Sequence, residues 1–408
     1  MPMDWKKNRK LLLGVTGGIA AYKAPETVRE FRKHGWEVEV ILSRSAERFV
    51  SPLSISSLSS RRVWLEDDFL SAERGWKIPH ISLAEWADVM IVAPATASFL
   101  HGAAFGDGST LLHASLLAAR CPVLIFPAMN VNMWEHSAVR DNAKKCSELG
   151  YHLVEPESGE LACGSEGKGR LPSIDVIREE TFRAVCPSAD LDGVSVLVTS
   201  GPTREAIDPV RFISNPSSGK MGSAVARTAW YRGAEVVMIS GPSSQPVPYG
   251  IRVIPVVSAI EMYDAVMLEA PAYDVIVKAA AVGDFTPSRV MDRKIKREKE
   301  KNLTIEFTPN PDIAASLGAS KRPGQYLVGF AAETEDAVAN ASAKLVRKGL
   351  DLIVANSVSG DASAFGSEYN SVVMIGKEGI EKEISGTKEE VADAVWGIVL
   401  KKLEAAGL

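Results

Sequence analysis

The fold of this chain is indicated most directly by residues 194–222, VSVLVTSGPTREAIDPVRFISNPSSGKMG. A β-branched apolar run at 194–198 ends at the turn Gly201-Pro202, and a polar segment broken by prolines follows. The glycine-rich loop 217–222 then opens a helical pattern. A strand, a loop of free backbone N–H groups and a helix N-terminus in this order are typical of the start of an α/β nucleotide-binding unit.

The same order occurs near the N-terminus, so the chain begins such a unit twice. Residues 10–15 predict a buried strand, Thr16-Gly17-Gly18 a turn, and 19–33 a helix. A length of 408 residues is enough for two domains with separate cores. We therefore predict an α/β protein with two doubly wound, Rossmann-like parallel-sheet domains, at 1–189 and 190–408.

Composition excludes several classes of function. The net charge of -5 gives no basis for nucleic-acid binding, and no apolar stretch is long enough to span a bilayer or resembles the core of a signal peptide. The four cysteines show no CxxC spacing and the six histidines no HxxxH pair, which argues against a structural zinc site. We expect a cytoplasmic protein with free thiols that binds neither nucleic acid nor membranes.

Small polar residues follow the predicted strands of the first half. Further strands are predicted at 36–42, 88–93 and 122–126, and ligands of parallel sheets bind beyond the carboxyl ends of the strands. Thr16, Ser43, Thr96 and Asn130 all fall at that edge. A dinucleotide fold would need GxGxxG and an acid after the second strand, and both are missing, so a mononucleotide phosphate fits better. Plain βα turns remain the alternative.

Five motifs of the first half resemble the flavin-containing cysteine decarboxylase family: GVTGGIAAYKA (14–24), IPHISLAEWAD (78–88), APATA (93–97), PAMNVNMW (127–134) and ACGSEGKGR (162–170). Within it they look like the phosphopantothenoylcysteine decarboxylases of coenzyme A synthesis. The resemblance implies a flavodoxin-like FMN domain, His80 as a base, Asn130 holding the substrate carboxylate and Cys163 donating a proton from a mobile flap. The FMN-binding residues that it implies are Thr16, Gly17, Gly18, Ser43, Thr96, Ser98 and Met129.

The residue types fit flavin-dependent decarboxylation, in which the flavin carries the redox step and the protein supplies orientation and a proton. Without the resemblance, His80 would be interpreted as a surface histidine or one with satisfied hydrogen bonds, Asn130 as a turn residue and Cys163 as an ordinary small residue. Relatives carry Asn or Asp where Ser98 stands, and an Asn-Asp-like pair in place of Ser109-Thr110. Because hydroxyl groups still hydrogen-bond, we expect FMN binding to be retained.

The second half shows a linker and then a second alternation of strands and helices. A helix at 173–185 and the linker 186–188 precede the predicted strands 194–199, 235–240, 252–256, 274–279, 325–329 and 350–356. Helices are predicted at 222–232, 259–270 and 332–348. The loop 217–220 is not a P-loop, because Met221 follows Lys220, so it is a glycine-rich helix start or a plain turn. Asp284, followed by the basic cluster 293–297, suits a nucleoside triphosphate with Mg2+.

Five motifs of this half resemble phosphopantothenate–cysteine ligases: GPTREAIDPVRFISNPSSGKMG (201–222), AAAVGDF (279–285), KIKR (294–297), NPDI (310–313) and GFAAET (329–334). The resemblance implies that CTP activates 4'-phosphopantothenate as an acyl-cytidylate, releasing pyrophosphate, and that the amine of L-cysteine displaces CMP. It places Asn215 at the acyl intermediate in a loop shared across a dimer, and Lys294 is expected to stabilise charge on the α-phosphate. The nucleotide contacts that it implies are Lys278, Ala279, Ala280, Asp284, Pro311, Asp312, Ile313, Ala314, Phe330, Lys344 and Lys348.

Two smaller points qualify this resemblance. Lys344 and Lys348 are spaced i, i+4, which also fits an ordinary solvated helix face. Ala355-Asn356-Ser357 stands where relatives carry Asn-Asp. No residue is assigned as a metal ligand.

Together the halves predict a bifunctional enzyme that makes 4'-phosphopantetheine by ligation and then decarboxylation. The resemblance implies a homo-oligomer of decarboxylase trimers and ligase dimers that closes into a dodecamer. A flavin-binding regulatory subunit is the first rival, and Cys163 on its flap argues against it. A dehydrogenase-like oxidoreductase is the second, and the missing GxGxxG argues against it.

Overall fold

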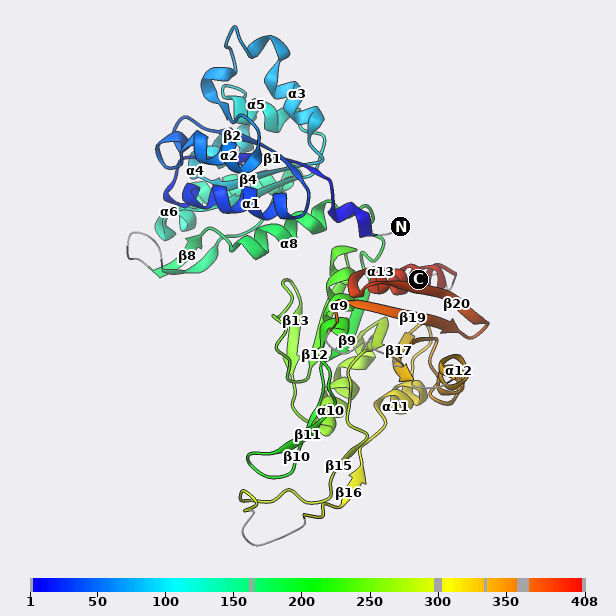
Figure 1. The fold of residues 1–408 in the computed structure, drawn as a ribbon. Coiled ribbons are helices and arrows are strands. Elements are labelled where there is room, and N and C mark those ends of the chain that lie inside the picture. Colours follow the sequence, from blue (N-terminus) through cyan, green and yellow to red (C-terminus); the bar gives the residue numbers. More distant parts are fainter. Residues whose placement is uncertain are drawn as a thin grey trace. The chain divides into compact units, whose positions relative to one another are not determined.

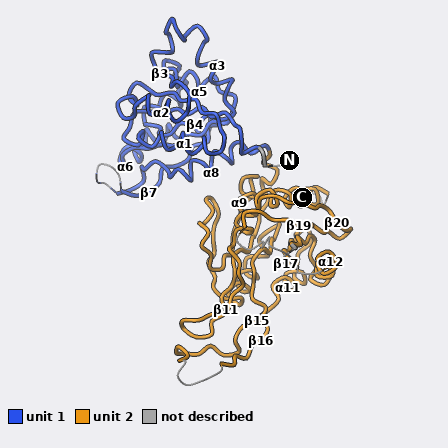
Figure 2. Tube along the Cα trace, in the orientation of Figure 1, with its two compact units in different colours: residues 1, 3–187 blue, residues 2, 188–408 orange. Residues whose placement is uncertain are grey.

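The computed structural model describes residues 3–160, 164, 166–296, 303–333, 336–357 and 367–405 (Figure 1). The chain forms two compact units, residues 3–187 and residues 188–408 (Figure 2). Each unit is built on its own sheet, and the two sheets share no strand. Among the described residues, no helix has the length and apolar character needed to cross a bilayer.

Unit 1 contains a six-stranded sheet in the order β3-β2-β1-β4-β5-β6, and all of its strand pairs are parallel. The strands are β1 Lys10–Val15, β2 Glu37–Leu42, β3 Trp64–Leu65, β4 Val89–Ala95, β5 Val123–Pro127 and β6 His152–Leu153. All seven residues of β4 are buried, as expected for a strand covered on both faces. The predicted parallel sheet is confirmed here.

The helices of unit 1 pack on this sheet. They are α1 Ala24–Lys33, α2 Pro52–Ser59, α3 Pro79–Trp86, α4 Ala97–Phe105, α5 Leu111–Ala118, α6 Val131–Glu135, α7 Ser137–Glu148 and α8 Ile174–Ala184. Short 3-10 turns lie at η1 Met3–Lys6, η2 Ile19–Lys23, η3 Ala46–Arg48, η4 Glu66–Asp68 and η5 Gly75–Lys77. The predicted helix 19–33 is thus a 3-10 turn that continues into α1. An antiparallel pair, β7 Glu157–Glu160 and β8 Glu166–Arg170, precedes α8.

Unit 2 contains an eight-stranded sheet in the order β13-β12-β9-β14-β17-β18-β19-β20. Its strands are β9 Ser195–Ser200, β12 Glu235–Ser240, β13 Arg252–Pro255, β14 Val275–Lys278, β17 Tyr326–Glu333, β18 Leu352–Ser357, β19 Tyr369–Gly376 and β20 Gly379–Thr387. The six strands from β13 to β18 are parallel, whereas β19 and β20 are antiparallel. The mostly parallel α/β fold is confirmed, and it includes two strands that the prediction lacked: β19, antiparallel to β18, and the edge strand β20, antiparallel to β19.

The helices of unit 2 are α9 Lys220–Tyr231, α10 Ala259–Glu269, α11 Ile313–Ser320, α12 Ala337–Arg347 and α13 Lys388–Ala405, with a 3-10 turn at η6 Ala270–Ala272. The predicted start of a helix at residue 332 is wrong. Ala331 and Ala332 continue β17, because they pair with Ala355 and Asn356 of β18. This pairing keeps residues 329–333 in the sheet and delays the helix to Ala337.

Two narrow antiparallel ladders extend from unit 2, and we call them the arms (Figure 1). The first arm is the hairpin of β10 Arg204–Ala206 and β11 Phe212–Ser214. The second arm pairs β15 Phe285–Pro287 with β16 Phe307–Pro309. The two arms contact each other through β10 and β15.

Candidate functional sites

The end of strand β1 in unit 1 is tied to the end of β4 through one hydroxyl group. Thr16 Oγ1 donates to the carbonyl oxygen of Pro94 at 2.8 Å and accepts from the Thr96 N–H at 3.0 Å. Thr96 Oγ1 in turn accepts from the Phe99 N–H at 3.3 Å and so caps α4. These bonds bring the loops after β1 and β4 to one edge of the sheet, as the sequence predicted.

Gly17 lies where only a glycine fits. A side-chain carbon at this position would collide with Cβ of Ser45, and it would lie 2.8 Å from the carbonyl carbon of Ser45. The loop after β1 therefore packs directly on the loop after β2. Ser43 lies in that second loop, where its N–H donates to the carbonyl oxygen of Val15 at 3.0 Å.

A cavity of about 430 Å³ opens at this edge, within the size range of small-molecule sites. Its lining includes the predicted residues Gly17, Gly18, Thr96, Met129 and Asn130. Lys23, Arg170 and Met133 also line it, and the sequence prediction missed them. Burial, and then the neighbouring Arg170, lower the pKa of Lys23. Lys23 and Arg170 therefore give this cavity two cations against the one carboxylate of Glu160, which suits an anionic group.

Asn130 begins helix α6, and its Oδ1 accepts from the Asn132 N–H at 2.9 Å. Strand β8 lies against the same turn, because the Met129 N–H donates to the carbonyl oxygen of Gly169 at 2.9 Å. Cys163 lies outside the described residues. Its predicted role therefore stays a prediction.

Four predicted residues of the described part of the chain do not line this cavity: Thr16, Ser43, His80 and Ser98. Ser98 is exposed on α4, whereas His80 lies on α3 with its ring against Phe69 at 5.4 Å between ring centres. The Nδ1 atom of His80 is buried and has no hydrogen-bond partner among the described residues. A buried ring nitrogen without a partner is unusual, and a catalytic role is one of the explanations for such an atom.

The glycine-rich loop of unit 2 borders a cavity of about 520 Å³. Asn215 starts this border, and its Nδ2 donates to the carbonyl oxygens of Ala281 and Val282 at 3.2 and 3.1 Å. Strand β14 contributes Lys278 at its carboxyl end, and β17 contributes Phe330. The predicted residues that line the cavity are Asn215, Lys278, Ala279, Ala280, Asp284, Ala314, Phe330, Lys344 and Lys348.

The lining of this cavity is strongly basic, although the whole chain is acidic. It contains five lysines and one carboxylate: Lys220, Lys278, Lys344, Lys348, Lys388 and Asp284. Burial, and then the neighbouring Lys348, lower the pKa of Lys278. This concentration of positive charge favours a polyanionic ligand.

Asp312 stands beside the cavity rather than in its lining. It caps α11 by accepting from the Ala315 N–H at 3.1 Å, and it pairs with Lys348 at 3.1 Å. Pro311 and Ile313 also lie outside the lining, and Lys294 is exposed on the second arm. The structure therefore gathers most of the predicted nucleotide contacts and leaves Lys294 apart from them.

The sequence prediction missed Lys220, Lys388, Asn356 and Asn370 as lining residues. The sequence did contain a signal for Lys220, because this lysine ends the SSGK stretch of the glycine-rich loop. Lys388 begins α13, is only 6% exposed and donates from Nζ to the carbonyl oxygen of Ser367. It is more than a hundred residues from the loop in sequence, so no local pattern could place it there.

Comparisons with known proteins match both units. Residues 3–185 match the family model "Flavoprotein", and residues 191–403 match "DNA/pantothenate metabolism flavoprotein C-terminal domain". Over 398 residues the chain is 42% identical to the coenzyme A biosynthesis bifunctional protein CoaBC of Vibrio cholerae, covering 97% of this chain and 98% of that one. This chain belongs to the CoaBC family.

The CoaBC protein of Bacillus subtilis is 46% identical over 380 residues, which cover 92% of this chain and 93% of that one. The crystal structure of a CoaBC C-terminal domain is 38% identical, covers 53% of this chain and all of that chain, and superposes with a TM-score of 0.45. Membership of the CoaBC family confirms both resemblances seen in the sequence. The predicted function is confirmed as a bifunctional coenzyme A biosynthesis enzyme with decarboxylase and ligase activities.

Proposed function

We propose that residues 190–408 join 4'-phosphopantothenate to L-cysteine with CTP, and that residues 1–189 decarboxylate the product with FMN to give 4'-phosphopantetheine. The observation that carries the ligase part is the cavity of unit 2, where five lysines and one carboxylate border a glycine-rich helix start. A nucleoside triphosphate needs cations and backbone N–H groups around its phosphates, and this cavity offers both.

In the ligase step, CTP activates the substrate carboxylate as an acyl-cytidylate and releases pyrophosphate. Lys278, Lys344 and Lys348 converge on the cavity and neutralise the phosphates. Asp284, at the rim, would hold Mg2+, which would offset the negative charge of the phosphates. Asn215, whose amide is fixed by two backbone carbonyl groups, orients the acyl intermediate for attack by the cysteine amine. Lys294, on the second arm, is the residue that would stabilise the charge developing on the α-phosphate.

The cavity of unit 1 fits an FMN group by its donor set. Gly17 and Gly18 present backbone N–H groups at a strand end, Lys23 and Arg170 supply positive charge, and Met129 and Met133 supply apolar surface. Bound FMN supplies the oxidation and the hydride return of this decarboxylation. Asn130 holds the substrate carboxylate, His80 removes a proton, and Cys163 returns one.

A homo-oligomer completes both sites in this proposal. His80, Ser43 and Ser98 lie off the unit 1 cavity of their own chain, which supports a decarboxylase trimer whose subunits share the flavin. The arms of unit 2 expose apolar side chains, which suits burial in a ligase dimer. These exposed residues are Val210, Phe212, Ile213, Phe285, Val290, Met291, Leu303 and Phe307. Trimers and dimers together give a closed dodecamer in the cytoplasm.

A charge-removal variant tests the ligase part. Lys278→Gln is expected to lower the rate of pyrophosphate release with CTP by about ten- to a hundredfold, because a charge-assisted hydrogen bond is lost. Lys377→Gln is the matched control, since it removes a lysine of the same unit that is exposed and pairs with Asp351 at 2.8 Å. Equal rates in both variants would contradict the placement of the nucleotide. The same assay with ATP decides the preferred nucleotide.

An absorbance spectrum tests the decarboxylase part. The purified chain is expected to show the bands of a bound flavin, and His80→Asn is expected to keep them while CO2 release falls. A colourless protein that still releases pyrophosphate would overturn the flavin assignment and leave the ligase assignment intact.

A further inference from the structure

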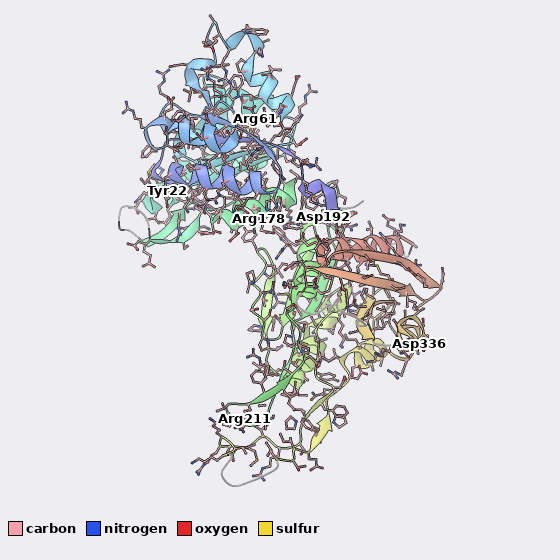
Figure 3. The ribbon with its side chains drawn as sticks, viewed as in Figure 1. Tyr22, Arg61, Arg178, Asp192, Arg211 and Asp336 are labelled. Atoms are coloured by element: carbon pink, nitrogen blue, oxygen red, sulfur yellow. The ribbon has the colours of Figure 1, made fainter. Side chains whose placement is uncertain are left out.

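The carboxylate of Asp208 lies at the turn of the first arm and is fully buried, with 0% of its side chain exposed. Oδ1 accepts from the N–H groups of Val210 and Arg211, both at 2.8 Å. Arg211, which Figure 3 labels on this arm, also pairs with Asp208 at 3.6 Å. The two backbone bonds shape the turn between β10 and β11 and occupy Oδ1, whereas Oδ2 faces the Arg211 guanidinium and takes its backbone donor from elsewhere in the chain.

Oδ2 of Asp208 accepts from the N–H of Ile295 on the second arm, at 3.2 Å and 87 residues away in sequence. A backbone bond beside it joins the Met291 N–H to the carbonyl oxygen of Ile207 at 2.9 Å. We call these two bonds the latch. Lys294 directly precedes Ile295, so one end of the latch holds the residue next to this lysine.

We propose that Asp208 is a positioning residue that holds Lys294 at a defined place on the second arm. Lys294 is exposed and lies in a segment without helix or strand, so its own local structure fixes its position poorly. The first arm leads directly into Asn215 of the glycine-rich loop, and the second arm leaves the cavity at Asp284. The latch therefore links the segment that contains Asn215, the segment that contains Asp284 and Lys294, so that these three move together. The catalytic consequence rests on the proposed role of Lys294 in the ligase step.

The latch bond between the Ile295 N–H and Asp208 is stronger than a bond between neutral groups, because its acceptor is ionised. Burial alone would raise the pKa of Asp208, but the N–H groups of Val210, Ile295 and Arg211 hold it below its ordinary value. A carboxylate with three backbone donors thus keeps its charge at neutral pH, and hydrogen bonds to charged acceptors are about twice as strong as neutral ones.

Asp208→Asn breaks the bond of the latch that Asp208 accepts, and it also removes the negative charge that pairs with Arg211. The amide oxygen of the asparagine still accepts from the N–H groups of Val210 and Arg211. Its amide nitrogen is a donor and cannot accept a hydrogen bond from the Ile295 N–H. In hydrogen–deuterium exchange of the full chain, we expect the amides of the peptide 291–296 to exchange about tenfold faster in the variant than in the wild type. The reason is the loss of one charge-assisted hydrogen bond. Ser288→Ala is the control. It removes a bond from Ser288 Oγ to the carbonyl oxygen of Glu306 on the same arm, at 3.1 Å, and leaves the latch intact.

Kinetics then separate positioning from simple destabilisation. Asp208→Asn is expected to lower kcat for pyrophosphate release by about tenfold with little change in KM for the nucleotide, since the lost interaction acts in the transition state. In a Lys294→Gln background, the same substitution is expected to have no further effect on kcat. Additive losses would overturn the proposal, because Asp208 would then act independently of Lys294.

Ile295→Pro tests the latch from its other end, in case the Asp208 variant does not fold. It removes the donor N–H and leaves the first arm unchanged, and we expect the Met291 amide to exchange faster. Unchanged exchange at 291–296 in both variants would overturn the latch. If Lys294→Gln alone keeps full ligase activity, its proposed role in the ligase step fails, and the exchange result still decides whether Asp208 holds this segment.

Discussion

Gly222→Ala tests whether the glycine-rich loop must pack closely on the end of strand β9. A methyl group on Gly222 would lie 2.5 Å from Oγ, 2.6 Å from Cβ and 2.9 Å from Cα of Ser200. Ser200 ends a buried strand, and its Oγ donates to the carbonyl oxygen of Gly219 at 3.0 Å. Because the strand backbone cannot retreat, the start of α9 has to move away.

The expected magnitude follows from two opposing effects. Alanine is favoured over glycine inside a helix by about 1 kcal/mol, and overpacking of this kind costs about 1–3 kcal/mol. We therefore expect a net loss of unfolding free energy of up to about 2 kcal/mol. The displaced N–H groups are expected to weaken CTP binding by about tenfold, since a misplacement of about 1 Å is enough to impair a preorganised site.

The assay combines isothermal titration with CTP and the urea midpoint of the transition that abolishes CTP binding. Gly397→Ala is the matched control, because Gly397 lies in α13 and a side-chain carbon there would meet nothing within 4 Å. That variant is expected to bind CTP normally and to be as stable as the wild type or slightly more stable. If Gly222→Ala also binds CTP normally and unfolds at the wild-type urea concentration, the reasoning about close packing is refuted.

Two further predictions concern the flavin loop and a buried ion pair. Gly17→Ala is expected to lose bound flavin, because the added carbon collides with Ser45. The flavin absorbance after gel filtration measures this loss. A variant that retains flavin would contradict the placement of the flavin at this loop. Asp351 has a side chain that is 10% exposed and lies 2.7 Å from Lys321. Burial alone would raise the pKa of Asp351, but Lys321 and Lys377 hold it below its ordinary value, so its stabilisation is present above the unfolded pKa and is lost as pH falls through the folded pKa. Asp351→Asn is therefore expected to lower the free energy of unfolding by about 2–3 kcal/mol at pH 7 and by progressively less below about pH 4. Urea unfolding of the wild type and the variant at pH 7 and at about pH 3 measures this difference. A difference that does not shrink at the lower pH would contradict the assigned role of the ion pair.

The sequence predicted the parallel strands well, because each is a short apolar run closed by a turn. Val89–Ala95 and Ser195–Ser200 are buried along nearly their whole length, and such runs stand out without any alignment. Glycine positions after β1 and β9 were also found from the sequence, since a strand, a glycine turn and a helix follow one another directly.

Other features could not be predicted from local patterns. Strand β20 is mostly exposed, so no apolar run marks it. Ala331 and Ala332 suit a helix by propensity, and only their pairing with β18 keeps them in a strand. Lys388 and Asp208 act through partners that are distant in sequence, such as the Ile295 N–H, and a single sequence contains no signal for such contacts.

The central claim is that one chain ligates and then decarboxylates the same substrate, and a coupled assay tests it most directly. The full-length protein is supplied with 4'-phosphopantothenate, CTP, Mg2+ and L-cysteine labelled with carbon-13 at its carboxyl group. Labelled CO2 and pyrophosphate are followed together. The account predicts equal amounts of the two products at completion, with pyrophosphate appearing first. Pyrophosphate without labelled CO2, or labelled CO2 without pyrophosphate, would contradict it.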